Sequence, residues 1–106
     1  MRRPARRGEV WLVDLGMVQK TRPALVLSIG FLDHERTVVS YVPRTTSIRD
    51  TRFEVEHVGH GFGAGAFDAQ GIGGVPAVKL MRKLGEVDEA TLERVEAAVR
   101  AWLGLA

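Results

Sequence analysis

Two short stretches of the sequence carry side chains that could do chemistry together. Arg22 ends the basic run KTR and directly precedes the apolar run PALVLSIG, and Thr45 follows YVPR at the start of a polar stretch. A guanidinium beside hydroxyl groups can hold phosphate oxygens without a metal ion. The alternative is that Arg22 packs on the rim of the fold while the threonines cap a turn. The residue types alone leave both interpretations open.

The charge of the chain is unevenly distributed. Residues 1–53 contain ten Lys and Arg against five Asp and Glu, whereas residues 54–106 contain five against eight. The two halves therefore carry +5 and −3, which sum to the formal net charge of +2. A basic half favours a polyanionic partner, of which nucleic acid is the commonest. A solvated basic face without a ligand is the alternative.

Length and composition limit the class of protein. With 106 residues and no cysteine, the chain fits one domain without a disulfide scaffold, a thiolate nucleophile or a cysteine-ligated zinc. No apolar run is long enough to cross a membrane, and no apolar segment follows the basic start MRRPARR. We therefore expect a single cytoplasmic domain over residues 1–106, with residues 1–7 as a basic tail whose order is left open.

The hydrophobic pattern predicts the elements that must position these residues. Alternation and β-branched residues predict five short strands, over residues 9–15, 23–30, 37–43, 52–57 and 75–80. A capping residue, Asp88, and an apolar stripe predict a helix over 88–104. The glycine-rich stretch 58–74 is expected to be a mobile loop. Together these elements predict a mainly β fold, a small curved antiparallel barrel with a C-terminal α-helix.

This arrangement has a consequence for Arg22 and Thr45. If the second and third strands pair as a hairpin around DHER, both residues come to the same end of the sheet.

The other motifs in the sequence are weaker indications of a functional site. No helix pattern follows GFGAG or GIGG, so they do not indicate a nucleotide site. His57 and His60 lack an obvious third ligand, so no metal site is predicted.

Four ordered motifs, followed by the C-terminal segment, give a specific resemblance. RRGEVWLVDL, RPALVLS, VPRTTS and FEVE are similar to successive segments of the MazF/PemK family of toxins from type II toxin–antitoxin systems. KLGEVDEATLERVEAAVRAWLGL resembles the closing turn and helix of that family. The resemblance implies an SH3-like barrel of the MazF/CcdB type that acts as a homodimer without a metal or other cofactor. It also implies neutralisation by a cognate antitoxin.

The resemblance assigns an activity and residues for it. It implies sequence-specific cleavage of single-stranded RNA, usually mRNA, with Arg22 and Thr45 as the catalytic pair. The expected reaction is attack by the ribose 2′-OH on phosphorus, which leaves a 2′,3′-cyclic phosphate and a 5′-OH. Because a guanidinium remains protonated at ordinary pH, we expect Arg22 to stabilise charge. The expected RNA-binding residues are Gln19, Lys20, Arg44, Thr46, Ser47, Arg49 and Gln70.

Two other functions remain open for such a chain. The same barrel occurs in non-catalytic toxins that bind a protein target such as gyrase. A barrel of this kind could also be an RNA-binding module without activity. The pairing of Arg22 with Thr45 favours the nuclease.

Overall fold

The computed structural model describes residues 5–18, 20–59 and 63–105. Gln19, His60 and the first four residues of the basic tail lie outside the described residues, so the predictions made for them stay predictions. No helix in the described part of the chain is both long enough and apolar enough to span a membrane.

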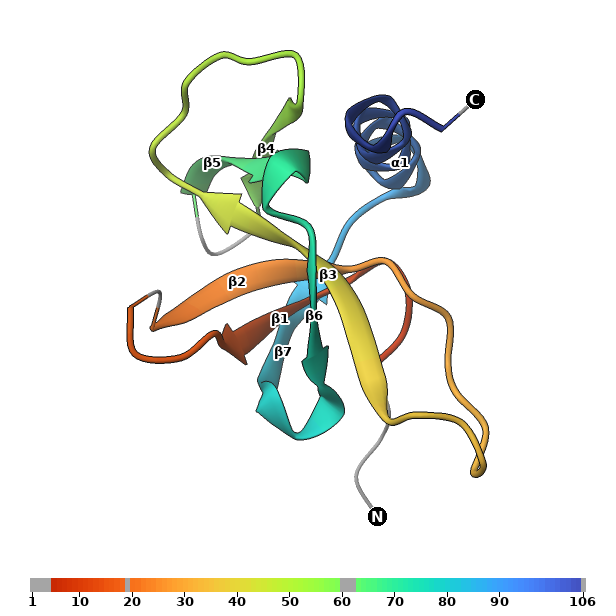
Figure 1. Ribbon diagram of the computed structural model, residues 1–106. Coiled ribbons are helices and arrows are strands. Elements are labelled where there is room, and N and C mark those ends of the chain that lie inside the picture. The colour runs from red at the N-terminus through yellow and green to blue at the C-terminus, as the bar shows by residue number, and fades with distance from the viewer. Residues whose placement is uncertain (1–4, 19, 60–62, 106) are drawn as a thin grey trace.

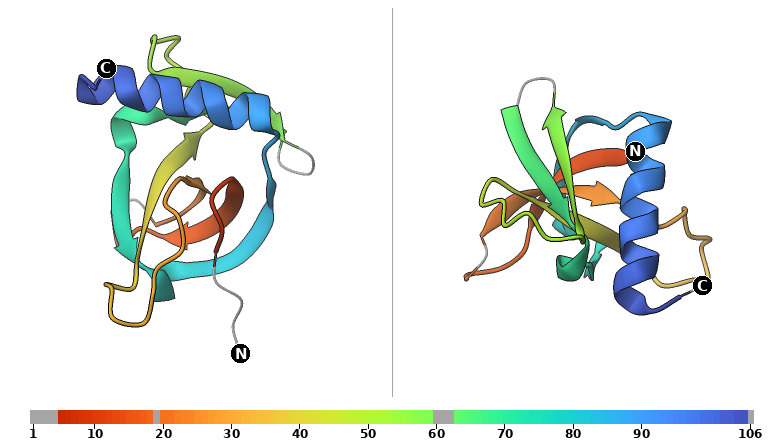
Figure 2. Two further views of the ribbon diagram at one scale, coloured as in Figure 1. Left: turned by 90° about the vertical axis from the view of Figure 1, so that its right-hand side faces the viewer. Right: turned by 90° about the horizontal axis from the view of Figure 1, so that it is seen from above.

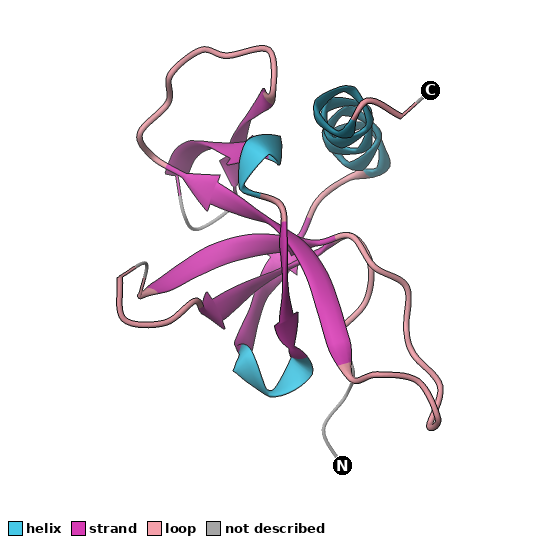
Figure 3. Ribbon diagram, in the orientation of Figure 1, coloured by secondary structure: helices cyan, strands magenta, loops and turns pink. Residues whose placement is uncertain are grey.

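The described chain forms seven strands, two short 3-10 helices and one α-helix (Figure 3). The strands are β1 (Glu9–Asp14), β2 (Thr21–Val26), β3 (Val38–Thr45), β4 (Glu54–Gly59), β5 (Gly63–Asp68), β6 (Gly73–Pro76) and β7 (Leu80–Glu86). The 3-10 helices are η1 (Ala69–Gly71) and η2 (Ala77–Lys79), and the α-helix is α1 (Glu89–Leu103). The mainly β prediction is confirmed; the hydrophobic pattern predicted five strands, and seven lie within the five to seven that the family resemblance implies.

The strands form one curled antiparallel sheet in the order β4-β5-β3-β2-β1-β7, with β6 paired to β3. Figure 1 shows β3 crossing the molecule between the β4–β5 hairpin and the part formed by β1, β2 and β7. Its first half pairs with β6, its middle with β2 and its last two residues with β5. The predicted hairpin of the second and third strands is confirmed, and β3 is the element that joins both parts of the sheet.

The helix begins and ends where the sequence predicts. The carboxylate of Asp88 accepts the N–H of Thr91 at 2.8 Å, and Gly104 closes the helix with φ of 70°. The helix lies across the top of the curled sheet (Figure 2). Of the predicted apolar stripe, Val95 and Val99 are buried, whereas Trp102 at the end of the helix is partly exposed and meets Phe53 edge to face.

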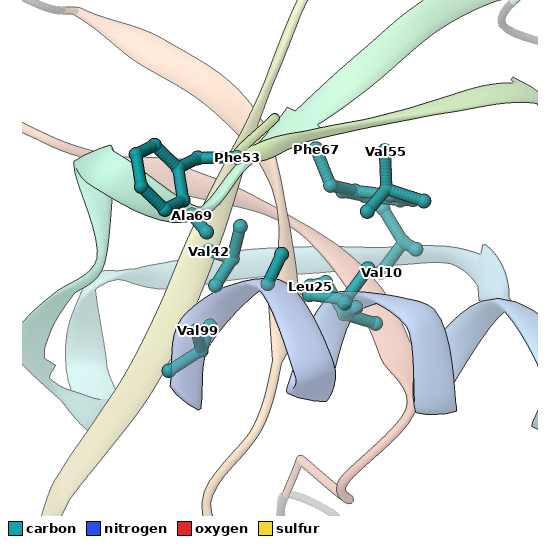
Figure 4. Close-up of a cluster of buried hydrophobic side chains, with 10 residues drawn as sticks. Val10, Leu25, Val42, Phe53, Val55, Phe67, Ala69 and Val99 are labelled. Carbon is teal, nitrogen blue, oxygen red and sulfur yellow. The ribbon is translucent and has the colours of Figure 1, made fainter. Parts of the chain in front are cut away.

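Two groups of buried side chains hold the sheet and the helix together. The larger lies between α1 and the sheet (Figure 4) and consists of Val10, Leu25, Val42, Phe53, Val55, Phe67, Ala69, Val95, Ala98 and Val99. The smaller group lies among β1, β2, β3 and β7 and consists of Val13, Ala24, Val26, Val39 and Leu80. Leu25 and Val42 lie opposite each other on β2 and β3, so the strands that bear Arg22 and Thr45 are anchored in the larger core.

The glycine-rich stretch is not the mobile loop that the sequence suggested, because most of its described part forms β5, η1 and β6. A Cβ on Gly65 would lie 2.6 Å from the guanidinium of Arg44, and one on Gly71 would lie 2.7 Å from the ring of Pro43. These glycines therefore permit close packing against β3. The number of glycines suggested a flexible segment, but the absence of side chains at these positions is what allows the neighbouring strands to lie close together.

Candidate active site

The register of the sheet brings Arg22 and Thr45 together. Ala24 pairs with Pro43 across the β2–β3 hairpin, and Arg22 and Thr45 each lie two residues further toward its open end. Val13 of β1 holds the backbone of Arg22 from the other side. Both side chains line one open groove of about 750 Å³. The prediction that they share one end of the sheet is confirmed.

The groove contains almost every residue that the sequence suggested for the site. The residues that line it are Lys20, Thr21, Arg22, Pro23, Pro43, Arg44, Thr45, Thr46, Ser47, Arg49, Thr51, Glu54, Asp68 and Gln70. Of the predicted set, Gln19 alone is missing, and it lies outside the described residues. Sequence reasoning did not assign the prolines, Thr21, Thr51, Glu54 or Asp68 to the site. Glu54 of β4 pairs with Asp68 of β5, which places both carboxylates in the groove. Because β5 was not predicted, this pairing could not be foreseen from the sequence.

The hydroxyl group of Thr45 is oriented by the turn that follows it. Its Oγ1 accepts the backbone N–H of Ser47 at 3.0 Å. A hydroxyl oxygen that accepts one hydrogen bond keeps its own proton to donate. Thr45 thus keeps a hydroxyl proton that it can donate to a ligand in the groove.

The cations at the other side of the groove are exposed. Within the described part of the chain, Arg22 forms no side-chain hydrogen bond and no ion pair, so its guanidinium is free to bind a ligand. Lys20 has a left-handed backbone with φ of 57°. Its N–H donates to the carbonyl of Gly16 at 2.6 Å and its carbonyl accepts the N–H of Leu15 at 2.8 Å. This closed turn fixes Lys20 beside Arg22.

Arg44 differs from the other cations because it is buried. Its side chain is 4% exposed. The guanidinium donates to the carbonyls of His57, at 2.9 Å, and Gly63, inside the β4–β5 hairpin. Burial lowers the pKa of this guanidinium. The geometry makes Arg44 a residue that ties β3 to the hairpin, and it does not favour the predicted contact with an RNA backbone.

Glu54 organises the loop over residues 46–53, which carries Ser47 and Arg49. One carboxylate oxygen, Oε1, accepts the N–H groups of Arg49 and Thr51, both at 3.0 Å. Asp50 between them is left-handed, with φ of 56°. The carboxylate therefore holds the turn that presents Arg49 to the groove.

Replacing Glu54 by alanine is expected to loosen this loop and to lower the free energy of unfolding by about 1 kcal/mol, because two amides lose a charged acceptor. The amide protons of Arg49 and Thr51 should exchange with solvent faster, which NMR can measure. Glu56→Ala is the matched control, since Glu56 is exposed on the same strand and lies outside the groove. Unchanged exchange at both amides in Glu54→Ala would contradict the role of the carboxylate.

His57 makes stability depend on pH. Burial and the neighbouring positive charge of Arg44 lower the pKa of its imidazole below 6.5. The Nε–H of Arg44 points to Nδ1 of His57 at 3.4 Å, which requires that nitrogen to be unprotonated. As the pH falls below 6.5, the unfolded chain takes up this proton first. The contribution of neutral His57 to stability is therefore lost as the pH falls through the folded pKa.

We expect His57→Gln to weaken the dependence of the melting temperature on pH between 7.5 and 5.5, because the glutamine does not titrate. Thermal melts followed by circular dichroism measure this difference. The control is His34→Gln, in the exposed loop between β2 and β3. If acidification lowers the melting temperatures of the parent and of His57→Gln by the same amount, His57 is not the group that causes the pH dependence.

The fold and the groove define a small curled β-barrel whose open end presents cations and hydroxyl groups to an anionic ligand. Residues 6–103 match the family described as PemK-like, MazF-like toxin of type II toxin-antitoxin system. The chain belongs to this family, as its motifs suggested.

Solved structures agree with this assignment. An endoribonuclease from a mycobacterial species, in complex with its cognate antitoxin, is 28% identical with a TM-score of 0.83, and the match covers 96% of this chain and 97% of that one. A second mycobacterial endoribonuclease is 27% identical with a TM-score of 0.81, over 99% and 96% of the two chains. MazF from Deinococcus radiodurans, at 22% identity, 98% and 100% coverage and a TM-score of 0.84, shows the same fold.

Proposed function

We propose that this toxin is a metal-independent endoribonuclease that cleaves single-stranded RNA at specific sequences. The observation that carries the proposal is that the free guanidinium of Arg22 and the hydroxyl of Thr45 line the same open groove. The family and the two mycobacterial endoribonucleases support it. A group of three or more residues able to hold a metal ion does not occur among the described residues.

The proposed reaction is the one that the family resemblance implies, and the donors in the groove suit it. The ribose 2′-oxygen forms a bond to the neighbouring phosphorus and gives up its proton, while the bond from phosphorus to the 5′-oxygen breaks and that oxygen gains a proton. Negative charge grows on the two non-bridging oxygens. The N–H groups of Arg22 and the O–H of Thr45 stabilise these oxygens, without reorganisation during the reaction. The products are a 2′,3′-cyclic phosphate and a 5′-OH.

The exposed polar residues around this pair hold the rest of the RNA. Lys20 and Arg49 contact phosphates, and Thr46 and Ser47 donate hydrogen bonds beside them. Arg44 supports the groove from within the fold. Gln70 also lines the groove, and Gln19 remains a predicted contact.

Replacing Arg49 by alanine tests the backbone contacts. Loss of one phosphate contact is expected to reduce the slope of log affinity against log salt by about 0.7 for a single strand. Binding of an uncleavable RNA, with the attacking 2′-OH replaced, can be followed by fluorescence anisotropy at several salt concentrations. Arg52→Ala is the control, because the Arg52 guanidinium lies over the ring of Phe53 and outside the groove. A slope that stays unchanged in Arg49→Ala removes this residue from the interface.

The proposal includes partners and a location. A cognate antitoxin is expected to have an acidic, disordered segment that folds across the groove and covers Arg22, Lys20 and Arg49.

We also expect a cytoplasmic homodimer, which would extend the groove for a longer RNA. Sedimentation velocity checks this state, and a species of 11.7 kDa at micromolar concentration would contradict the dimer. Expression alone should arrest growth, and co-expression with the antitoxin should restore it.

Incubation with end-labelled RNA in EDTA tests the activity itself. We expect discrete fragments that end in a cyclic phosphate, in the parent and not in Arg22→Ala. Binding of RNA without fragments would instead indicate an RNA-binding module. Neither binding nor cleavage, together with growth arrest, would favour a toxin that acts on a protein target such as gyrase.

A further inference from the structure

The groove is lined by side chains of two chemical kinds. Arg22, Thr45 and Arg49 suit phosphate oxygens, whereas Asp68 adds a carboxylate that a phosphate would repel. Gln70 lies beside it with an amide that both donates and accepts hydrogen bonds. Because the bases carry the main hydrogen-bond donors of single-stranded RNA besides the 2′-hydroxyl groups, this part of the groove suits a base edge.

The register places Asp68 one step away from the proposed reaction centre. Thr45 of β3 lies opposite Ala66 of β5, and Asp68 follows Ala66 by two residues. Residues two apart on a strand point to the same face of the sheet. Asp68 is therefore a diagonal neighbour of Thr45, a separation of about 7–8 Å between backbones. A base lies several ångströms from its own phosphate, so a nucleotide held at Thr45 can extend its base toward Asp68.

Within the part of the chain that the structure describes, only one oxygen of Asp68 has a partner. Oδ1 accepts the N–H of Gln70 at 3.1 Å and so caps the 3-10 helix η1. Oδ2 takes part in no hydrogen bond or ion pair within the described residues. Glu54, the other carboxylate in the groove, is already engaged by the loop over residues 46–53. Asp68 is thus the acidic side chain that remains able to accept a hydrogen bond from a ligand.

We propose, on the basis of the proposed nuclease function, that Asp68 and Gln70 select a base whose Watson–Crick edge carries an amino group beside a ring nitrogen acceptor, which is adenine or cytosine. Oδ2 accepts the exocyclic N–H and the amide of Gln70 donates to the ring nitrogen. Uracil and guanine present a carbonyl oxygen where adenine and cytosine present the amino group. That oxygen would face a carboxylate oxygen without a proton between them.

The substitution Asp68→Asn tests this selection. Asparagine keeps the shape and an oxygen for the η1 cap, and its amide can also donate to a carbonyl oxygen. A pool of RNA with random sequence is incubated with the parent and the variant, and the new 5′ ends are sequenced. We expect the parent to require adenine or cytosine at one fixed position next to the cut. The variant should accept uracil there, with discrimination reduced on the order of 10-fold to 100-fold. Glu56→Gln, an exposed carboxylate outside the groove, should keep the parental preference.

A base analogue gives an independent measurement. In the best substrate, the selected adenine or cytosine is replaced by an analogue that lacks only the amino group. The parent should cleave this substrate on the order of tenfold more slowly, whereas Asp68→Asn should show a much smaller difference. Thermal melts of both proteins confirm that the variant is folded.

The outcomes separate the two proposals. A parent that leaves the random pool uncut contradicts the nuclease function, and the inference with it. A parent that cuts without preference for adenine or cytosine, or a variant with the same preference as the parent, contradicts the inference alone. A variant that loses cleavage equally at every sequence also contradicts it, since Asp68 would then act on the reaction and not on the identity of the base.

Discussion

Replacing Arg22 by alanine is expected to lower the rate of RNA cleavage by a factor on the order of 10²–10³, while the fold stays intact. The loss is large because this guanidinium faces the groove without a partner among the described residues, so its charge is available to the reaction. The fold should survive, because the side chain is exposed while the backbone is part of β2 and pairs with Val13 of β1. Single-turnover cleavage of a labelled RNA measures the rate, and a thermal melt measures the fold.

Three further variants identify the cause of the loss. Arg22→Lys keeps the charge but not the forked donors, and it should remain strongly impaired. Arg36→Ala removes an exposed arginine from the loop at the far end of the β2–β3 hairpin, so it should cleave like the parent. An Arg22→Ala protein with parental cleavage would show that the site has been assigned to the wrong residue. Thr45→Val should also be severely slowed, since it removes the oriented donor while preserving a β-branched side chain.

The elements that the sequence predicted well are those with strong local signals. The helix has a capping aspartate and a terminal glycine that act as predicted, and an apolar stripe that buries Val95 and Val99 but leaves Trp102 partly exposed. β1, β2 and β3 have dense β-branched residues and bury their apolar positions in the two cores. β5 and the first half of β6 were missed because glycine lowers the propensity for strands, and these glycines permit close packing against β3, which is distant in sequence. The strand predicted over residues 75–80 was wrong in its middle, where η2 lies, and it reached only the first residue of β7.

The candidate site shows the same division between local and distant information. Arg22 and Thr45 were predictable because one hairpin brings them together. The burial of Arg44 could not be predicted, since its partners His57 and Gly63 belong to the β4–β5 hairpin, and β5 was not recognised in the sequence. Asp68 was not assigned to the groove for the same reason. A residue type can suggest a chemistry, but the partner that occupies or frees that residue is set by the tertiary fold.

Gly65→Ala is expected to destabilise the protein by about 1–3 kcal/mol, because the added methyl group overpacks the contact between β5 and β3. Its Cβ would lie 2.6 Å from Nη1 of Arg44 and 2.9 Å from the carbonyl oxygen of Thr45. The side chain of Arg44 can move only by giving up hydrogen bonds inside the hairpin, and the carbonyl of Thr45 belongs to the β3 backbone. Urea unfolding followed by fluorescence gives the change in free energy.

Gly74→Ala is the matched control, because it adds the same methyl group in the same glycine-rich stretch. Its nearest contact would be the carbonyl oxygen of Val39 at 3.8 Å, an ordinary van der Waals distance. This variant should unfold within a few tenths of a kcal/mol of the parent. Since the backbone of Thr45 must shift to admit the methyl group at position 65, Gly65→Ala should also cleave RNA more slowly under conditions in which it is fully folded. Equal stability of the two variants would mean that β5 does not approach β3 closely, and the buried role of Arg44 would then be wrong as well.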